Sequence, residues 1–329
     1  MKHTKLRFLA TALAAVLLLT ACAGGAASTQ TTAPASKTAE AQTGAASEDT
    51  QQWVPTKDIT FVVPYEAGGN SDIPARIFAK YMSNYADVSV NVTNIEGAGG
   101  RTGAQQVMEM DADGSVILMQ PVAYPMQHSM GVASFTYEDF EPVGQWLDSC
   151  LALVVNSGSG IENLEQFIAK AKETPGAVKM GSVSGTLPMF AAMYLQQQSG
   201  AEFNLVDLSH NKAPELMSNR VDAYIDGFGA VKQYVDSGEF TCIALFTDTD
   251  LEGYEYLKQS FGMWAPKGTP AQAVAYINNV MRQAAEDPAC QEELKAAGFA
   301  AAYMTVEDYT SFMADTYAKF QEAAAGLAG

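Results

Sequence analysis

Histidine, cysteine and basic residues are scarce in this chain of 329 residues. It has three histidines, four cysteines and 19 lysines and arginines against 37 aspartates and glutamates, which gives a formal charge of -18. A chain this acidic is a poor partner for nucleic acid or an anionic lipid surface, and an anionic ligand would need a local electropositive pocket. C-x-x-C and H-E-x-x-H spacings are both absent from the sequence. We therefore predict no metal site and no cofactor.

Long apolar runs are scarce at the N-terminus as well. The run at residues 8–19 is shorter than the roughly 20 residues that span a bilayer. It follows three basic residues and leads through small residues to Cys22. This order is typical of a bacterial lipoprotein signal, in which cleavage leaves a lipid on Cys22. Removal of the signal peptide, residues 1–21, would change the formal charge from -18 to -21. The alternative is an ordinary secretory signal with an incidental cysteine.

The segment after Cys22 lacks the residues that build a core. Residues 23–52 contain no Leu, Ile, Val, Met or aromatic residue. Such a segment cannot bury enough apolar surface to offset its conformational entropy, so residues 22–52 are predicted to be a disordered tether. Folded structure is expected to begin near Trp53. A long polar tether favours a protein that crosses a thick wall, and hence a Gram-positive cell surface.

The three other cysteines are too few for a disulfide framework. Cys150 and Cys242 lie in apolar, strand-like runs, and Cys290 lies in a polar stretch. One bridge between Cys150 and Cys242 would leave an odd thiol. Buried thiols are the other possibility, and the sequence leaves both open.

Apolar runs alternate with helical patterns along the folded region. Strands are expected at residues 59–63, 88–93, 116–119, 151–155, 178–181, 206–208, 223–225 and 242–246, and helices at 71–85, 102–110, 164–172, 189–198, 274–286 and 306–325. Strands that alternate with helices predict an α/β protein with a mostly parallel sheet.

Three glycine-rich turns lie between a predicted strand and a predicted helix. They are residues 65–72 (YEAGGNSD), 97–103 (GAGGRTG) and 181–186 (GSVSGT). A helix start offers unpaired N–H groups and a partial positive charge, so such turns can bind a carboxylate. Glycine before a helix is also common for structural reasons alone. The turns match no nucleotide fingerprint, and Val183 occupies the place of a nucleophilic serine, so no enzyme is predicted.

Two of these turns resemble a known family. Together they are similar to the paired loop signature of the extracytoplasmic solute receptors of tripartite tricarboxylate transporters, also called Bug proteins. The first part of the signature falls on Pro64, Tyr65, Gly68, Gly69, Asp72, Ala75 and Arg76, and the second on Gly97 to Gly100, Gly103, Ala104, Asp113 and Gly114. The third turn lacks the family's histidine, and a family segment is missing near residues 247–261. The chain is thus identified as a divergent member.

The resemblance implies a two-domain, type II periplasmic-binding-protein-like fold of the α/β class, also called a Venus flytrap. Domain one would comprise residues 53–148 plus 246–329, and domain two residues 149–245. A monomeric, lipid-anchored receptor would capture a small carboxylate, either a di- or tricarboxylate or an amino acid, between the domains. It would pass this ligand to the integral membrane subunits of a secondary transporter. A receptor that signals to a membrane partner is the alternative, and an exported enzyme is a more remote one.

The same resemblance assigns roles to residues of the turns. Domain one would hold the carboxylate with Gly68, Gly69, Asn70, Gly99, Gly100, Arg101 and Thr102, with Tyr65 as a wall, and domain two would contribute Ser182, Ser184 and Thr186. Arg101 is equally consistent with a solvated surface residue. Asp226 follows a predicted strand, where it could bind an amino group or cap a turn or helix. Asp72 is expected to cap the first turn of its helix rather than touch an anion.

Overall fold

The structure is a computed structural model that describes residues 53–208, 212–246 and 258–327. All of these residues belong to one compact unit. The predicted signal peptide, the lipidation site Cys22 and the tether lie outside the described residues, as does most of the segment 247–261. Within the described part, no helix combines the length and the apolar character needed to cross a bilayer.

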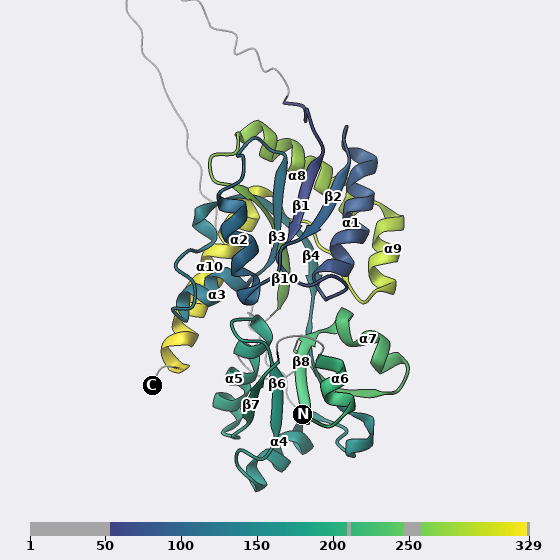
Figure 1. Cartoon of the computed structure of the whole chain (residues 1–329), viewed down its shortest axis with the longest axis vertical. Coiled ribbons are helices and arrows are strands. Elements are labelled where there is room, and N and C mark those ends of the chain that lie inside the picture. Colours follow the sequence, from purple (N-terminus) through teal and green to yellow (C-terminus); the bar gives the residue numbers. More distant parts are fainter. Residues whose placement is uncertain (1–52, 209–211, 247–257, 328–329) are drawn as a thin grey trace, which may run out of the picture. The chain divides into compact units, whose positions relative to one another are not determined.

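The first β-sheet combines segments from both ends of the folded region (Figure 1). Its strands are β1 (Ile59–Val63), β2 (Val90–Asn94), β3 (Val116–Pro121), β4 (Phe140–Ser149), β10 (Gln259–Pro266) and β11 (Ala300–Ala301). Their order across the sheet is β11–β4–β10–β3–β1–β2. Strand β1 pairs in parallel with β2 and β3. The remaining pairs, β10 with β3, β10 with β4 and β11 with β4, are antiparallel.

The second β-sheet is built from the middle of the chain. Its strands are β5 (Leu151–Asn156), β6 (Lys179–Ser182), β7 (Asn204–Asp207), β8 (Ala223–Gly227) and β9 (Phe240–Leu245). Their order is β7–β6–β8–β5–β9. Strand β6 pairs in parallel with β7 and β8, whereas β5 pairs antiparallel with β8 and β9. The chain segments of the two sheets are therefore distinct, while the division into two domains stays a prediction.

Both sheets are mixed, so the predicted α/β class is confirmed but the expectation of a mostly parallel sheet is wrong. Only Cys150 separates β4 from β5, so the chain passes directly from one sheet into the other. The strands that make this crossing, and the returning strands β9 and β10, all have antiparallel neighbours. A count of alternating strands and helices along the sequence does not reveal such crossings.

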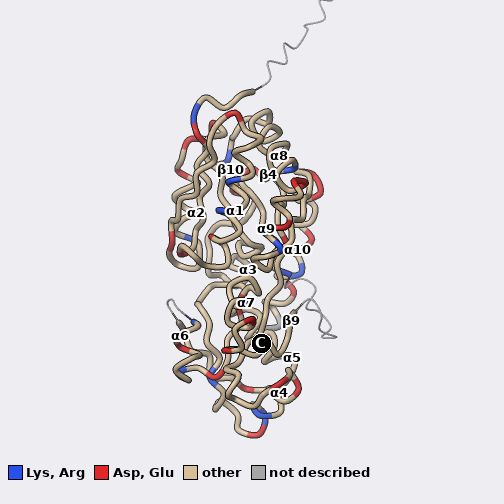
Figure 2. Tube along the Cα trace, turned by 90° about the vertical axis from the view of Figure 1, so that its right-hand side faces the viewer, with Lys and Arg blue, Asp and Glu red and all other residues tan. Residues whose placement is uncertain are grey.

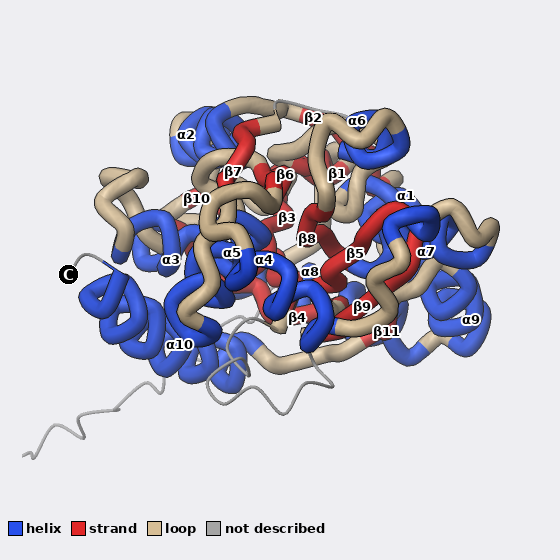
Figure 3. The backbone as a smooth tube through the Cα atoms, turned by 90° about the horizontal axis from the view of Figure 1, so that it is seen from below, coloured by secondary structure: helices blue, strands red, loops and turns tan. Residues whose placement is uncertain are grey.

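Helices cover both sheets (Figure 3). Around the first sheet are α1 (Asp72–Tyr85), α2 (Arg101–Met108), α3 (Ala123–Ser129), α8 (Ala271–Glu286), α9 (Pro288–Ala296) and α10 (Val306–Leu327). Around the second are α4 (Leu164–Glu173), α5 (Leu187–Ser199), α6 (Lys212–Met217) and α7 (Phe228–Asp236). Single turns of 3₁₀-helix lie at Ala98–Gly100, Tyr137–Asp139 and Ser157–Ser159. Helix α10 also contacts the second group, because Phe320 lies 5.4 Å from Phe190 of α5, measured between ring centroids.

Helix α1 illustrates how the sequence pattern becomes a packed layer. Ala75, Phe78 and Met82 recur at helical spacing, and none of them is exposed to solvent. The Phe78 ring packs on Trp146 of β4 with centroids 4.4 Å apart. Burial of a side chain of this size contributes roughly 1.5–3 kcal/mol, so this face holds the helix on the sheet. This packing also fixes the position of the start of α1.

The structure records Cys150, Cys242 and Cys290 as thiols. Burial raises the pKa of Cys242 to about 11, although a backbone hydrogen bond with Ala244 opposes the shift. Burial likewise raises the pKa of Cys290 to about 12. The structure therefore favours thiols over a bridge between Cys150 and Cys242, but only Cys290 is fully buried, whereas Cys150 and Cys242 are partly buried.

Candidate functional site

A cavity of about 490 Å³ lies where the three glycine-rich turns meet. The turns follow β1, β2 and β6, at the carboxyl ends of parallel strands, where ligands of α/β sheets bind. Nine of the predicted site residues line the cavity: Tyr65, Gly68, Gly69, Asn70, Gly99, Gly100, Ser184, Thr186 and Asp226. The other three, Arg101, Thr102 and Ser182, are not among its lining residues. Contact of these residues with a solute stays a prediction.

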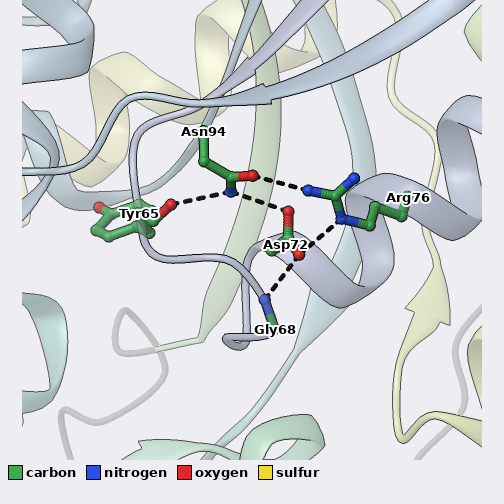
Figure 4. A network of polar contacts seen from close by, with 5 residues as sticks. All are labelled: Tyr65, Gly68, Asp72, Arg76 and Asn94. Carbon is green, nitrogen blue, oxygen red and sulfur yellow. Dashed lines mark hydrogen bonds and ion pairs between the residues drawn. The ribbon is translucent and has the colours of Figure 1, made fainter. Parts of the chain in front are cut away.

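The first turn is held closed by a polar network around Asp72 (Figure 4). The Asp72 carboxylate accepts the N–H of Gly68 and the Nε–H of Arg76, each at 2.8 Å, and the Nδ2–H of Asn94 at 2.9 Å. Asn94 Nδ2 also donates to the carbonyl of Tyr65 at 3.0 Å. Burial alone would raise the pKa of Asp72, but the hydrogen bonds from Arg76, Gly68 and Asn94 outweigh it and lower the pKa.

This network corrects the expected role of Asp72. The helix α1 has Ser71 at its N-cap and no side-chain capping bond, so Asp72 braces the preceding turn instead of capping the helix. The N–H groups of Asn70 and Ser71 have no hydrogen-bond partner among the described residues. Both residues line the cavity. The start of a 14-residue helix thus offers two unpaired donors to the cavity.

The second turn depends on backbone conformations that favour glycine. Gly99 and Gly100 have φ of +65° and +94°. A Cβ atom on Gly100 would lie 2.9 Å from the hydroxyl of Tyr65, which in turn accepts the Nε2–H of Gln120 at 3.1 Å. Burial raises the pKa of Tyr65 well above its usual range, so its hydroxyl stays protonated. Close packing of Tyr65 on glycine places the start of α2 beside the start of α1, both at the cavity.

Two of the three hydroxyl groups in the third turn, those of Ser184 and Thr186, already have hydrogen-bond partners within the protein. Ser184 donates its N–H to Asp207 at 3.0 Å and its Oγ–H to the same carboxylate at 2.7 Å. Thr186 Oγ1 donates to the carbonyl of Val183 at 2.7 Å. The predicted role of Ser184 and Thr186 as hydroxyl donors to a solute would therefore require these bonds to open. Ser182 is 1% exposed at the end of β6 and lies behind the turn.

Contacts between the second and third turns close one side of the cavity. Gln127 of α3 is fully buried, and its Nε2 donates to the carbonyls of Gly99 at 2.7 Å and Gly185 at 2.5 Å. A Cβ atom on Gly185 would lie 2.7 Å from Nη1 of Arg101. Arg101 therefore packs against this contact, and its buried Nη1 has no hydrogen-bond partner among the described residues.

Lys212 is a cavity residue that the sequence analysis missed. It is the first residue of α6, and its ammonium forms an ion pair with Asp226 of β8. The two side chains are only 14% and 17% exposed. A single lysine at the start of a short helix has no sequence signature, so only the proximity of α6 to the end of β8 reveals it.

The cavity is acidic despite its helix starts. Four carboxylates line it, those of Glu66, Glu96, Asp207 and Asp226, whereas Lys212 is its single lining cation among the described residues. Elsewhere acidic residues are spread over the helices and loops of the side shown in Figure 2. The anion-binding potential of the cavity therefore comes from backbone N–H groups rather than from a surplus of basic side chains.

The fold is that of the periplasmic binding proteins. A solved structure of the periplasmic binding protein BugD superposes with a TM-score of 0.75 at 24% identity, covering 83% of this chain and 98% of that one. A structure of a Rhodopseudomonas palustris protein with adipate superposes with a TM-score of 0.77 at 22% identity, covering 83% and 98%. These likenesses establish the fold.

The family follows from the sequence comparison. Residues 74–325 match the family described as "Tripartite tricarboxylate transporter family receptor". The protein BugT of Bordetella pertussis is 27% identical over 281 residues, which cover 79% of this chain and 86% of BugT. The chain belongs to the tripartite tricarboxylate transporter receptor family, as its paired loop signature predicts.

Proposed function

We propose that this protein is a lipid-anchored, extracytoplasmic receptor that captures a small carboxylate solute and delivers it to the membrane subunits of a tripartite tricarboxylate-type transporter. Membership of the receptor family supports this function. The structural neighbour that holds adipate supports a carboxylate as the ligand class. The receptor acts by binding alone, with no chemical step, and works as a monomer.

The observation that carries the proposal is the convergence of helix starts on one cavity. Residues of the turns before α1, α2 and α5 all line it, and the N–H groups of Asn70 and Ser71 lack partners among the described residues. A helix start stabilises a nearby anion by about 0.3–1 kcal/mol, and a hydrogen bond to a charged group contributes about 1.5–3 kcal/mol. A carboxylate held by two such starts needs no arginine in the cavity.

A thermal shift screen of residues 23–329 against di- and tricarboxylates and amino acids tests the proposal. Ligand at about 100 times its dissociation constant should add about 2.7 kcal/mol to the free energy of unfolding. Gly68 lines the cavity at φ +77°, and a Cβ atom added there meets nothing within 4 Å. We therefore expect the variant Gly68→Asn to lose the ligand-dependent shift, because the new side chain occupies the cavity.

Gly238 provides the matched control. It has φ +78°, an added Cβ atom also meets nothing within 4 Å, and it is not among the lining residues of the cavity. Gly238→Asn should cost similar backbone strain and keep the full ligand shift. A folded protein that responds to no acid, or an equal loss of the shift in both variants, would contradict carboxylate capture at this site.

Anchoring and delivery need separate tests. Cys22 is the proposed lipidation site, and the tether of residues 22–52 carries the receptor at the surface of a Gram-positive cell. Labelling of cells with a radioactive fatty acid should mark the wild-type protein and not the variant Cys22→Ser. Deletion of the receptor should abolish uptake of the screened solute. Uptake that persists, together with a lost transcriptional response to the solute, would favour a signalling receptor instead.

The two sheets are proposed to belong to domains that close over the solute, with domain one formed by residues 53–148 plus 246–329 and domain two by residues 149–245. Closure conveys occupancy to a membrane partner only if the solute binds the closed arrangement better. Small-angle X-ray scattering should give a smaller radius of gyration with the solute than without it. An unchanged radius at saturation would contradict this mechanism.

A further inference from the structure

The charge balance of the cavity constrains the solute. Among the described residues, its lining has four carboxylates and one lysine, which leaves an excess of three negative charges. Lys212 is already paired with Asp226 inside the cavity. A di- or tricarboxylate would add two or three further negative charges to this lining, whereas a neutral amino acid adds none and an acidic amino acid adds one. Glu66, Glu96 and Asp207 are exposed, so solvent and salt screen part of their repulsion of an anionic solute. The remaining repulsion still favours a solute that carries its own cation over one that adds only negative charge.

Hydrogen-bond acceptors gather where that cation would lie. Asn70 is 9% exposed, and its buried Oδ1 has no partner among the described residues. Its amide lies against Gly227, since a Cβ atom on Gly227 would meet it at 2.1 Å. Gly227 directly follows Asp226, so an unpaired amide oxygen and a carboxylate belong to the same wall of the cavity. Both accept hydrogen bonds, and an ionised carboxylate group has none to donate.

The ammonium group of Lys212 already lies at this wall of the cavity. The Lys212 Nζ contacts the Asp226 carboxylate and lies 5.9 Å from the centroid of the Tyr224 ring. A carboxylate together with an aromatic face is a typical environment for an ammonium ion. The Lys212 ammonium thus occupies the position that the cation of a solute would take.

Resting on the proposed function, we propose that the solute is a zwitterion, of the amino acid class. Its carboxylate binds the N–H groups at the start of α1, and its ammonium binds Asp226 and Asn70 Oδ1. The ammonium of the solute replaces Lys212 Nζ, and the flexible lysine side chain turns toward solvent about its own torsions. One cation replaces another, so Asp226 is never left unpaired.

A substitution of Lys212 distinguishes a zwitterionic solute from a dicarboxylate. If the solute were a dicarboxylate, Lys212 would leave Asp226 and bind the second carboxylate. The substitution Lys212→Met would then abolish binding. If the solute is a zwitterion, Lys212 competes with it for Asp226, and the same substitution keeps the affinity or tightens it. A dicarboxylate and a zwitterion therefore predict opposite effects of Lys212→Met on the affinity for the solute.

Calorimetric titration of residues 23–329 with matched acids is the test. The pairs differ only in an ammonium group: glutamate and glutarate, aspartate and succinate, leucine and 4-methylpentanoate. We expect at least one amino acid to bind at least tenfold more tightly than its partner without the ammonium. Asp226→Asn should lower the affinity for that amino acid at least tenfold and change the affinity for the partner acid less than threefold. Lys212→Met should not lower the affinity for the amino acid.

The control variant is Lys232→Met, which removes an ion pair with Asp236 on α7 but does not line the cavity. It should bind like the wild type. Tighter binding of a dicarboxylate than of its amino acid, or loss of binding in Lys212→Met alone, overturns the zwitterion proposal and leaves the carboxylate receptor standing. If a folded wild type binds none of these acids nor any tricarboxylate, both proposals fail. The wild-type comparison of matched acids decides the question even where a variant does not fold.

Discussion

Replacement of Asp72 by asparagine should destabilise the first turn, although the two side chains have the same shape. In the native turn Asp72 Oδ2 accepts two hydrogen bonds, from Gly68 and Arg76, and Oδ1 accepts one from Asn94. The amide of the substituted side chain has only one acceptor, so its NH₂ group must face a donor in either orientation. The Asp72 side chain is 3% exposed, so water cannot relieve this conflict.

The expected loss is about 3 kcal/mol at pH 7. It combines one lost hydrogen bond to a charged group, about 1.5 kcal/mol, with a buried donor left unsatisfied, about 1–3 kcal/mol. Little is added for the ion pair itself, because Arg76 is half-exposed and solvent screens it. Urea unfolding followed by tryptophan fluorescence measures the change, and the melting temperature should fall by roughly 6 °C.

The pH dependence has a definite sign. The pKa of Asp72 is lowered in the folded state, so its contribution is fully present above the unfolded-state value of about 3.9 and is lost as the pH falls through the folded-state pKa. The difference between the wild type and Asp72→Asn should therefore shrink below about pH 4. The control Asp236→Asn removes an exposed ion pair and should cost under about 0.5 kcal/mol. A loss below about 0.5 kcal/mol in Asp72→Asn at pH 7 would refute the reasoning, since the network would then have no energetic role.

Three further predictions concern close packing and burial. Gly100→Ala should cost about 1–2 kcal/mol in backbone strain and also displace Tyr65, so the melting temperature and the ligand-dependent shift should both fall. Gly262→Ala should cost at least about 3 kcal/mol in urea unfolding, because the added Cβ would overlap the buried hydroxyl of Tyr309. Cys242 should react slowly with iodoacetamide at pH 7, with a rate that rises about tenfold per pH unit toward its pKa of about 11.

The controls for these predictions use positions without close neighbours. Gly238→Ala adds a methyl group in open space at φ +78°, so it should show the backbone strain and keep the ligand shift. Equal ligand shifts in Gly100→Ala and Gly238→Ala would argue against a role for Tyr65. A stable Gly262→Ala protein would mean that Tyr309 can move without cost. Rapid labelling of Cys242 at pH 7 in the folded protein would show that its thiol is accessible and ionised.

The glycine turns were predictable because their information is local. A β-branched run followed by glycines and an amphipathic stretch already requires a strand, a turn and a helix, and β1, α1 and α2 lie within two residues of their expected positions. The same turns carry the family signature. The nine predicted residues that line the cavity come from these turns and from the end of β8.

Other features of the fold and the cavity could not be predicted from short stretches of the sequence. Strand β4 contains proline and glycine, and it is held by β10 on one side and β11 on the other, which are distant in the sequence. The antiparallel pairs arise where the chain crosses between sheets, a decision made by tertiary pairing. The engagement of Ser184 by Asp207 and the packing of Arg101 beside Gly185 likewise depend on neighbours far along the chain.

By itself, the sequence determined the α/β class, the three glycine-rich turns that precede helices, and the family, because short-range patterns of apolar residues and glycines suffice for them. Only the tertiary structure decided that Lys212 faces Asp226 and that the cavity has an acidic lining. Charges act through space, so their balance depends on which side chains the fold brings together. The sign of the potential in a binding cavity therefore cannot be read from residues taken in chain order.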